Sequence, residues 1–162
     1  MTDTLKSICE QCGNIVNPQL DFIPQRLNLY RTIIERDLKQ LVFAASLEMD
    51  KAVVLLAGSI FEAVLHSFIQ AHAIDIEIDR AGVPFKFDPE SRLQKCVHIM
   101  KVYFARKIQN LDLLDSMARD RNLVHINQEI SKDPDACYRA SREMIRQLNL
   151  LLMDLANYSR RP

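Results

Sequence analysis

The residues of this chain that are best suited to chemistry form one short polar run, Arg119-Asp120-Arg121-Asn122-Leu123-Val124-His125. Histidine titrates near neutral pH, so it can act as a general base or a general acid. Arginine presents a fixed fork of donors to phosphate oxygens and stabilises the charge that develops on them. An arginine near a histidine is therefore suited to cleaving a phosphodiester. RNA would need no metal, because its own 2′-hydroxyl is the nucleophile.

The spacing of the run leaves two arginines as candidates. Arg121 and His125 are four residues apart and share one face of a regular helix. Arg119 and His125 are six apart, which separates them by roughly 120° on an ideal helix. That pair converges only if the helix is distorted or if a partner supplies the other half. A second interpretation stays open, in which the arginine and the aspartate pair at a solvated helix end and the helix dipole favours the histidine.

A lone carboxylate, Glu62, stands in an otherwise apolar stretch, as the only full charge between Lys51 and Asp75. A buried carboxylate without a partner costs several kcal/mol, so an arginine or lysine is expected beside it. With Ser59 and His66 it forms a narrow polar stripe at spacings of three and four. Glu62 either pairs with a structural cation or orients the arginine of the polar run, and the two can be the same contact.

Two cysteines, Cys9 and Cys12, have the spacing of half a zinc knuckle. Cys96 and Cys137 stand alone in the sequence, so a zinc site would need ligands from another chain. The three glycines are too scattered to make a phosphate-binding loop. We therefore predict no cofactor and, apart from that cysteine pair, no metal.

The hydrophobic spacing predicts helices along most of the chain. Apolar residues recur every three or four positions in five stretches, over about 23–41, 46–72, 90–103, 111–125 and 136–158. The second stretch is apolar nearly all round, which is typical of a central helix. Gly58 within it indicates a close approach by a neighbouring helix. The expected fold is an all-α, up-and-down bundle of four to five helices.

Two segments do not follow this helical pattern. Residues 1–19 are polar and show no helical period, so we expect a flexible N-terminal arm before a single bundle domain at 20–162. Between Ile74 and Asp79, apolar and acidic residues alternate strictly, and a Gly/Pro turn follows. This alternation predicts a short β-hairpin or an extended flap at about 74–87.

The charge balance limits what the chain as a whole can bind. Basic and acidic residues both number 21, so the formal net charge is zero. A protein with a large nonspecific nucleic-acid footprint is usually basic. Phosphate chemistry must therefore come from a local cluster. No apolar segment typical of a secretion signal opens the sequence, and the longest apolar stretch carries Glu62, so we expect a cytoplasmic protein with no membrane span.

A helical bundle whose late helix carries an arginine, a polar residue and then a histidine after four to six positions resembles the HEPN superfamily. The match here is Arg119, followed by polar Asp120, with five residues before His125. Arg121-Asn122 is a second start of the same kind, one residue too close to the histidine. Residues 55–65 also look like the family's central helix, which often carries an acid among small and apolar residues. The resemblance spans roughly 23–158.

The resemblance implies a metal-independent endoribonuclease, often the toxin of a toxin–antitoxin or phage-defence system. Such proteins act as homodimers in which two Arg/His motifs face each other across a two-fold axis. On this basis His125 is the general acid/base and Arg119 binds the scissile phosphate. The expected partners are RNA, a second copy and an antitoxin protein. The family also includes noncatalytic members, so a helical binding or assembly module is the alternative. The supporting residues would be Asp120, Arg121, Asn122 and Glu62.

Overall fold

In the computed structural model of the chain, residues 3–124 and 135–160 are described. These residues contain helices and no strand, so the predicted all-α bundle is confirmed. The α-helices are α1 (Leu5–Gln11), α2 (Gly13–Val16), α3 (Asn28–Ser46), α4 (Asp50–Ala71), α5 (Ala73–Asp79), α6 (Leu93–Phe104), α7 (Leu113–Asp120) and α9 (Ala136–Ser159). Two 3₁₀ turns are η1 (Gln25–Leu27) and η2 (Arg121–Val124).

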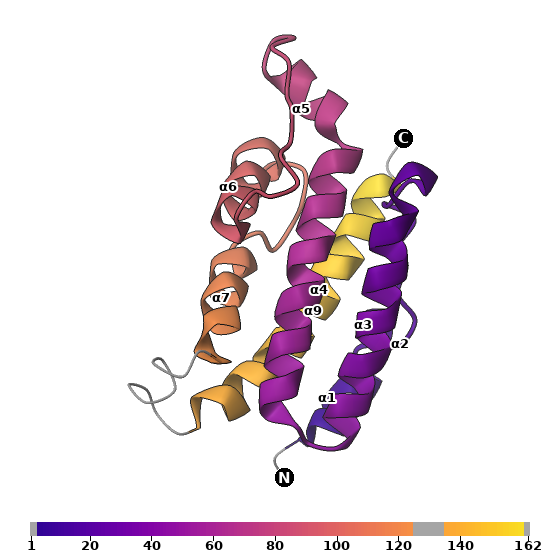
Figure 1. Ribbon diagram of the computed structural model, residues 1–162, viewed down its shortest axis with the longest axis vertical. Helices are drawn as coiled ribbons and strands as arrows, with labels where there is room; N and C mark the ends of the chain where they lie inside the picture. Colours follow the sequence, from indigo (N-terminus) through magenta and orange to yellow (C-terminus); the bar gives the residue numbers. More distant parts are fainter. Residues whose placement is uncertain (1–2, 125–134, 161–162) are drawn as a thin grey trace.

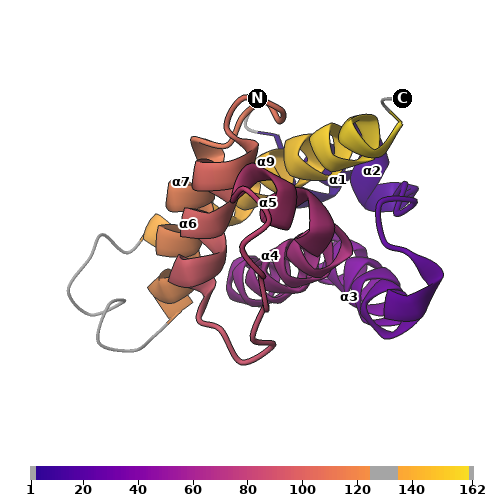
Figure 2. The same ribbon diagram turned by 90° about the horizontal axis from the view of Figure 1, so that it is seen from above.

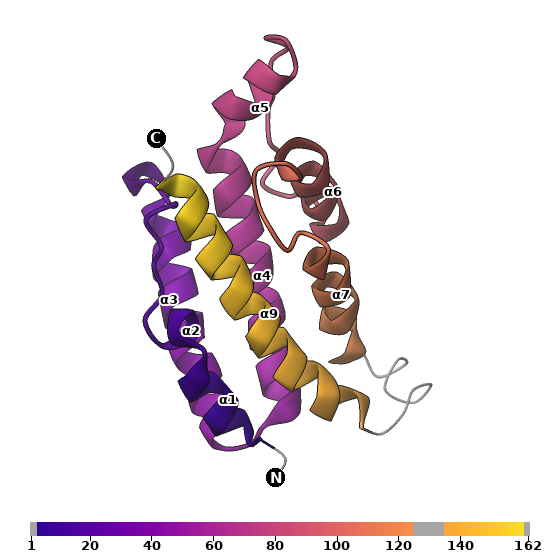
Figure 3. The same cartoon turned by 180° about the vertical axis from the view of Figure 1, so that it is seen from behind.

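Three long helices, α3, α4 and α9, form the body of the bundle (Figure 1). α4 packs against both α3 and α9, while α6 and α7 follow one another along the other side of α4. Figure 2 shows α6 and α7 on one side of α4 and α3 on the other. From behind, α1 and α2 lie across α3 and α9 (Figure 3). α4 therefore lies at the centre of the bundle, in contact with α3, α6, α7, η2 and α9.

Helix α4 supplies the centre of the core. Its large side chains Phe61, Leu65 and Phe68 are fully buried. By length and composition alone this 22-residue helix could cross a membrane, with a mean hydropathy of 2.0 over its most apolar window. However, 67% of that window is buried inside the bundle. The core helix of a bundle passes the same test, since it too must be apolar nearly all round.

The predicted flexible arm at 1–19 is wrong for residues 5–16, which form α1 and α2. Leu5, Ile8 and Ile15 are 0%, 1% and 1% exposed and belong to the same core cluster as α4. The Thr4 hydroxyl accepts a hydrogen bond from the Ser7 N–H at 3.1 Å and caps α1. Helices of seven and four residues are too short to show a period in sequence, and they are stabilised by packing on α3 and α9.

One side chain, Glu48, ties the start of the chain to the turn between α3 and α4. Its backbone has a φ of 53°, in the left-handed region. Its carboxylate accepts hydrogen bonds from the backbone N–H groups of Leu5 (3.2 Å) and Lys6 (3.4 Å). It also pairs with Arg142 Nη2 of α9 at 3.3 Å. Three distant parts of the sequence thus meet at one carboxylate, which satisfies donors at the N-terminus of α1.

The predicted β-hairpin at 74–87 is also wrong, and so is the alternative of an extended flap for residues 74–79. Its first half is helix α5, and residues 83–88 have no regular structure. α5 follows α4 directly through His72, whose Nδ1 lies 2.7 Å from Asp75 Oδ2. Of the alternating isoleucines, Ile76 is buried, whereas Ile74 and Ile78 are 69% and 68% exposed. The three isoleucines alternate with acidic residues as they would in a strand, but they lie on helix α5, which buries only Ile76.

Candidate functional site

The polar run predicted from the sequence begins in the last turn of α7 and continues through η2. Leu114, Met117 and Ala118 are buried and fix α7 on the bundle, and η2 contacts α4, α7 and α9. From Arg121 onward the α-helix tightens into a 3₁₀ turn. A 3₁₀ turn has three residues per turn, so positions computed for a regular α-helix do not hold across it. His125 lies outside the described residues.

Arg121 is anchored on the central helix. Its Nη2 donates to Glu62 Oε2 at 2.8 Å, and the two side chains are 39% and 31% exposed. Its aliphatic stem lies on Gly58, where an added Cβ would sit 2.5 Å from Arg121 Cγ. Gly58 thus permits the close approach that the sequence indicated. Glu62, which is partly buried, has the arginine partner that the sequence predicted, and that arginine belongs to the polar run.

Arg119, two residues earlier, has a different environment. Its side chain is 69% exposed, and its Nε lies 3.9 Å from Asp120 Oδ1. Its Nη2 donates to the Ser116 hydroxyl over a long 3.4 Å. Surface contacts of this kind contribute little energy, so the guanidinium can exchange them for a phosphate. Asn122 instead donates from Nδ2 to the Ala118 carbonyl at 3.2 Å, which satisfies a carbonyl at the end of α7.

The polar stripe on α4 does not form a single site. The Ser59 hydroxyl lies 3.4 Å from Asp37 Oδ2 of α3, while Glu62 turns to η2. The His66 ring is buried and stands edge-on to Phe87, with centroids 5.2 Å apart. These three polar groups therefore contact three different elements, and Glu62 alone joins the polar run.

A hydrogen-bond chain that the sequence did not predict connects Arg119 to α9. Buried Gln147 donates from Nε2 to the Ser116 hydroxyl (3.4 Å) and to Glu143 Oε1 (2.9 Å). Ser116 is also the residue that accepts from Arg119. The visible signal was the spacing on α9, where Glu143 and Gln147 are four residues apart and share a face.

A small pocket of about 250 Å³ lies beside this chain, between the end of α7 and the start of α9. Its lining residues are Asp120, Ala136, Arg139, Ala140 and Glu143. The two alanines are four apart, so they present small side chains on one face of α9. The alanines form a floor of small side chains that leaves room for a ligand, and charged groups of both signs surround it.

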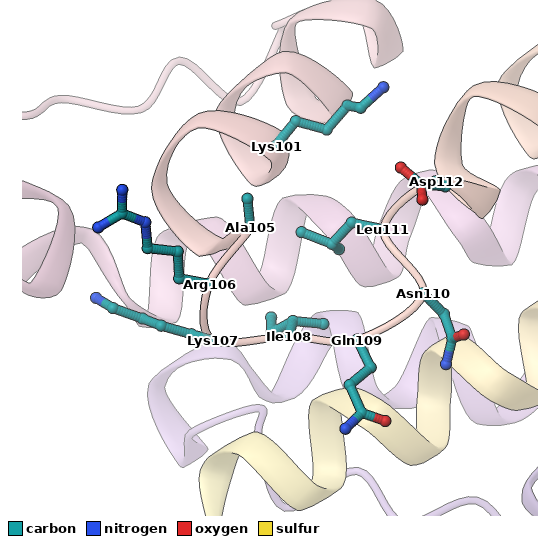
Figure 4. Close-up of a pocket in the computed structure, with 9 residues that line it drawn as sticks. All are labelled: Lys101, Ala105, Arg106, Lys107, Ile108, Gln109, Asn110, Leu111 and Asp112. Atoms are coloured by element: carbon teal, nitrogen blue, oxygen red, sulfur yellow. The ribbon is translucent and has the colours of Figure 1, made fainter.

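A larger pocket of about 550 Å³ lies in the loop between α6 and α7 (Figure 4). Three basic residues line it, but Lys107 pairs with Asp79 at 3.0 Å and Lys101 pairs with Asp115. Figure 4 shows the Arg106 and Lys107 side chains extending to one side of the loop and Lys101 to the other. The positive charge is thus partly neutralised and dispersed, which does not favour this pocket for phosphate.

Cys9 and Cys12 supply two thiols, fewer than the four ligands of a structural zinc site. Both thiols are buried, and burial raises the pKa of Cys9 to about 12 and also raises the pKa of Cys12. No group of three or more potential ligands (His, Cys, Asp or Glu) is found in the part of the chain that the structure describes.

The fold and this arrangement define an all-α bundle with a pair of arginines at the end of a short helix, one anchored and one exposed. No family model, curated protein or solved structure matches the chain. Function must therefore be inferred from the site itself.

Proposed function

We propose that this chain is a metal-independent endoribonuclease of the HEPN type, acting as the toxin of a toxin–antitoxin or phage-defence system. The observation that carries the proposal is that the two arginines have different surroundings. Glu62 holds Arg121 on the central helix at 2.8 Å, while Arg119 stays 69% exposed six residues before His125. An anchored segment that presents an exposed guanidinium suits a site that must bind a phosphodiester in a fixed place.

In the proposed reaction His125 accepts the proton of the ribose 2′-hydroxyl. The 2′-oxygen forms a bond to phosphorus, and the bond between phosphorus and the 5′-oxygen breaks. The leaving oxygen takes a proton from a second histidine, that of the partner subunit, as the motifs of a dimer would allow. Arg119 neutralises the charge on the phosphate oxygens as it grows. The products carry a 2′,3′-cyclic phosphate and a 5′-hydroxyl, so the atoms balance without a metal.

The proposed dimer finds support in an apolar area at one end of the α3–α4 hairpin. Phe43, Leu47 and Leu55 are 66%, 55% and 51% exposed, and Met49 in the turn is 49% exposed. Leu55 lies one helical turn before Gly58, the residue that Arg121 covers. An isologous interface pairs each patch with itself, so these exposed apolar side chains would suit a two-fold contact with a second copy.

The alternative is a noncatalytic binding or assembly module of the same fold. Both arginines of the run have an acidic neighbour, Asp120 for Arg119 and Glu62 for Arg121. The net charge is zero, and the exposed apolar area at Phe43 and Leu47 would suit a protein partner such as an antitoxin. In this case the Arg119–His125 run has a structural role.

RNA cleavage in excess EDTA separates these two functions. Wild-type protein, His125→Ala and Arg119→Ala are each incubated with mixed RNA, and their masses in solution are checked by sedimentation. We expect cleavage by the wild type alone, with 2′,3′-cyclic phosphate ends. Absence of cleavage by an intact wild-type dimer on mixed RNA would favour the assembly module. Cytoplasmic location follows as an expectation from either function and is tested by cell fractionation.

A further inference from the structure

The small pocket between α7 and α9 is directly connected to the exposed arginine of the polar run. Asp120, which follows Arg119, lines it on one side, and Glu143 lines it on the other. Glu143 accepts from Gln147, which also donates to Ser116, the acceptor of the Arg119 guanidinium. The pocket is therefore linked to Arg119 through Asp120 and through this hydrogen-bond chain.

The size of the pocket favours a small planar fragment. Its volume of about 250 Å³ is below the range of about 300–1,000 Å³ typical of pockets for drug-sized ligands. Ala136 and Ala140 leave a floor without large side chains. A single nucleobase suits this space better than a whole nucleotide.

The charges around the pocket select among the bases. Asp120 and Glu143 are acceptors when ionised, and Arg139 is a donor. Guanine is the base with two adjacent donors on one edge, its N1–H and its 2-amino group, which match the two oxygens of a carboxylate. Its N7 and O6 acceptors match an arginine fork. Adenine and cytosine offer only one amino group, and uracil only one N–H.

We propose that this pocket is a base-recognition subsite for guanine, with Glu143 and Arg139 as its specificity-determining residues. The inference rests on the proposed ribonuclease function, because it takes the base to be that of the nucleotide beside the scissile phosphate. Glu143 and Arg139 are exposed surface residues of α9. Glutamine at either position therefore removes a charge without disturbing the core.

The test is a binding measurement that does not depend on cleavage. Short RNA oligomers with 2′-O-methyl groups cannot be cleaved through the 2′-oxygen, and they carry a central G, A, C or U between the same flanking nucleotides, none of which is guanine. Fluorescence anisotropy is measured for wild type, Glu143→Gln and Arg139→Gln. The matched controls are Glu10→Gln on α1 and Arg106→Gln in the loop after α6, both exposed and outside this pocket. Circular dichroism verifies that every variant is folded.

We expect wild type to bind the G oligomer about tenfold more tightly than the other three, which is the discrimination typical of a bidentate contact. Glu143→Gln and Arg139→Gln should reduce that preference to within about twofold, while the two controls keep it. Equal binding of all four oligomers by wild type overturns the proposal, as does a preference that survives both pocket substitutions.

Cleavage in EDTA is measured in parallel so that the two proposals fail separately. Cleavage without a base preference supports the ribonuclease function and overturns the guanine subsite. If wild type prefers guanine but cleaves nothing, and the pocket variants lose that preference, the subsite is supported and the ribonuclease function is overturned. Absence of binding to every oligomer overturns the subsite.

Discussion

Arg119 and Arg121 lie two residues apart in the same short segment and have opposite surroundings. Arg121 lies on Gly58, pairs with Glu62 at 2.8 Å and is 39% exposed. Arg119 is 69% exposed, and among the residues that the structure describes it has a long contact to Ser116 and a distant one to the Asp120 carboxylate. From the spacing alone, both were candidates for the arginine that binds the scissile phosphate. Their environments suggest instead that one holds the segment and the other is available to a ligand.

The difference comes from where each residue lies relative to α4. Arg121 is the first residue of η2, which packs against α4, whereas Arg119 is on the exposed side of the last turn of α7. Removing a side chain that is fixed by both packing and a charged hydrogen bond lowers the stability of the fold, whereas removing an exposed one changes it little. Stability and activity should therefore respond to different arginines.

The largest expected effect is on activity, from Arg119→Ala. Loss of a donor to the phosphate should lower the rate of RNA cleavage by on the order of 100-fold, while the melting temperature stays unchanged. Cleavage assays and thermal melts on the same samples measure both. Arg106→Ala, an exposed arginine elsewhere, serves as the control. Wild-type cleavage by the Arg119 variant would remove this residue from the site.

Arg121→Ala should have the largest effect on stability. It leaves Glu62 without its cation and exposes Gly58, so we expect a loss of about 1–2 kcal/mol in the free energy of unfolding. This is below the roughly 3–5 kcal/mol of a fully buried pair, because both side chains keep access to water. Urea denaturation measures it. If this variant folds stably but cleaves no RNA, Arg121 is the motif arginine and the roles are exchanged.

Gly58→Ala tests the contact between the aliphatic stem of Arg121 and helix α4. A Cβ at 2.5 Å from Arg121 Cγ displaces the arginine at a cost of about 1–3 kcal/mol, offset by about 1 kcal/mol of helix propensity. The net expectation is a loss of roughly 1 kcal/mol. In the Arg121→Ala background the same change should cost less, because the Cγ at 2.5 Å is gone and only the Cβ of residue 121, at 3.2 Å, remains close. A double-mutant cycle in urea measures this difference, and equal effects in both backgrounds would contradict it.

The smallest effect is expected from Glu62→Gln. Its side chain oxygen still accepts from Arg121, so only the charge is lost, and stability should fall by less than about 1 kcal/mol. The same substitution should weaken the dependence of stability on salt, since the ion pair is partly exposed. Denaturation at low and at high salt measures both. A loss as large as that of Arg121→Ala would mean that the charge itself anchors the segment.

The sequence predicted the parts of this arrangement that depend on burial. The long apolar stretch of α4 indicated a central helix, and the lone carboxylate Glu62 within it required a cation. Gly58 indicated a close approach. Each inference follows from the cost of burying charge or of overlapping atoms, which is the same in any fold. The all-α bundle followed from the apolar periods of α3, α4, α6 and α9.

What the sequence missed depends on contacts between distant residues. α1 and α2 are too short to show a period and exist because α3 and α9 cover them. The alternation from Ile74 to Ile78 has the period of a strand, but the chain leaves α4 as a helix and continues as α5. The pocket beside Arg119 combines Asp120 with Arg139 and Glu143, which only the packing of α7 on α9 brings together.

The packing of α1 and α2 on α9 also sets an order for assembly in the cell. During synthesis the ribosome releases α1 and α2 before the chain of α9 exists. At roughly 5–20 residues per second, their partner follows on the order of ten seconds later. Helices α1 and α2 can pack on α3, which follows them closely in the sequence, but Glu48 gains its contact with Arg142 only when α9 has been made. The N-terminal helices therefore reach their full set of contacts only after the last helix has left the ribosome.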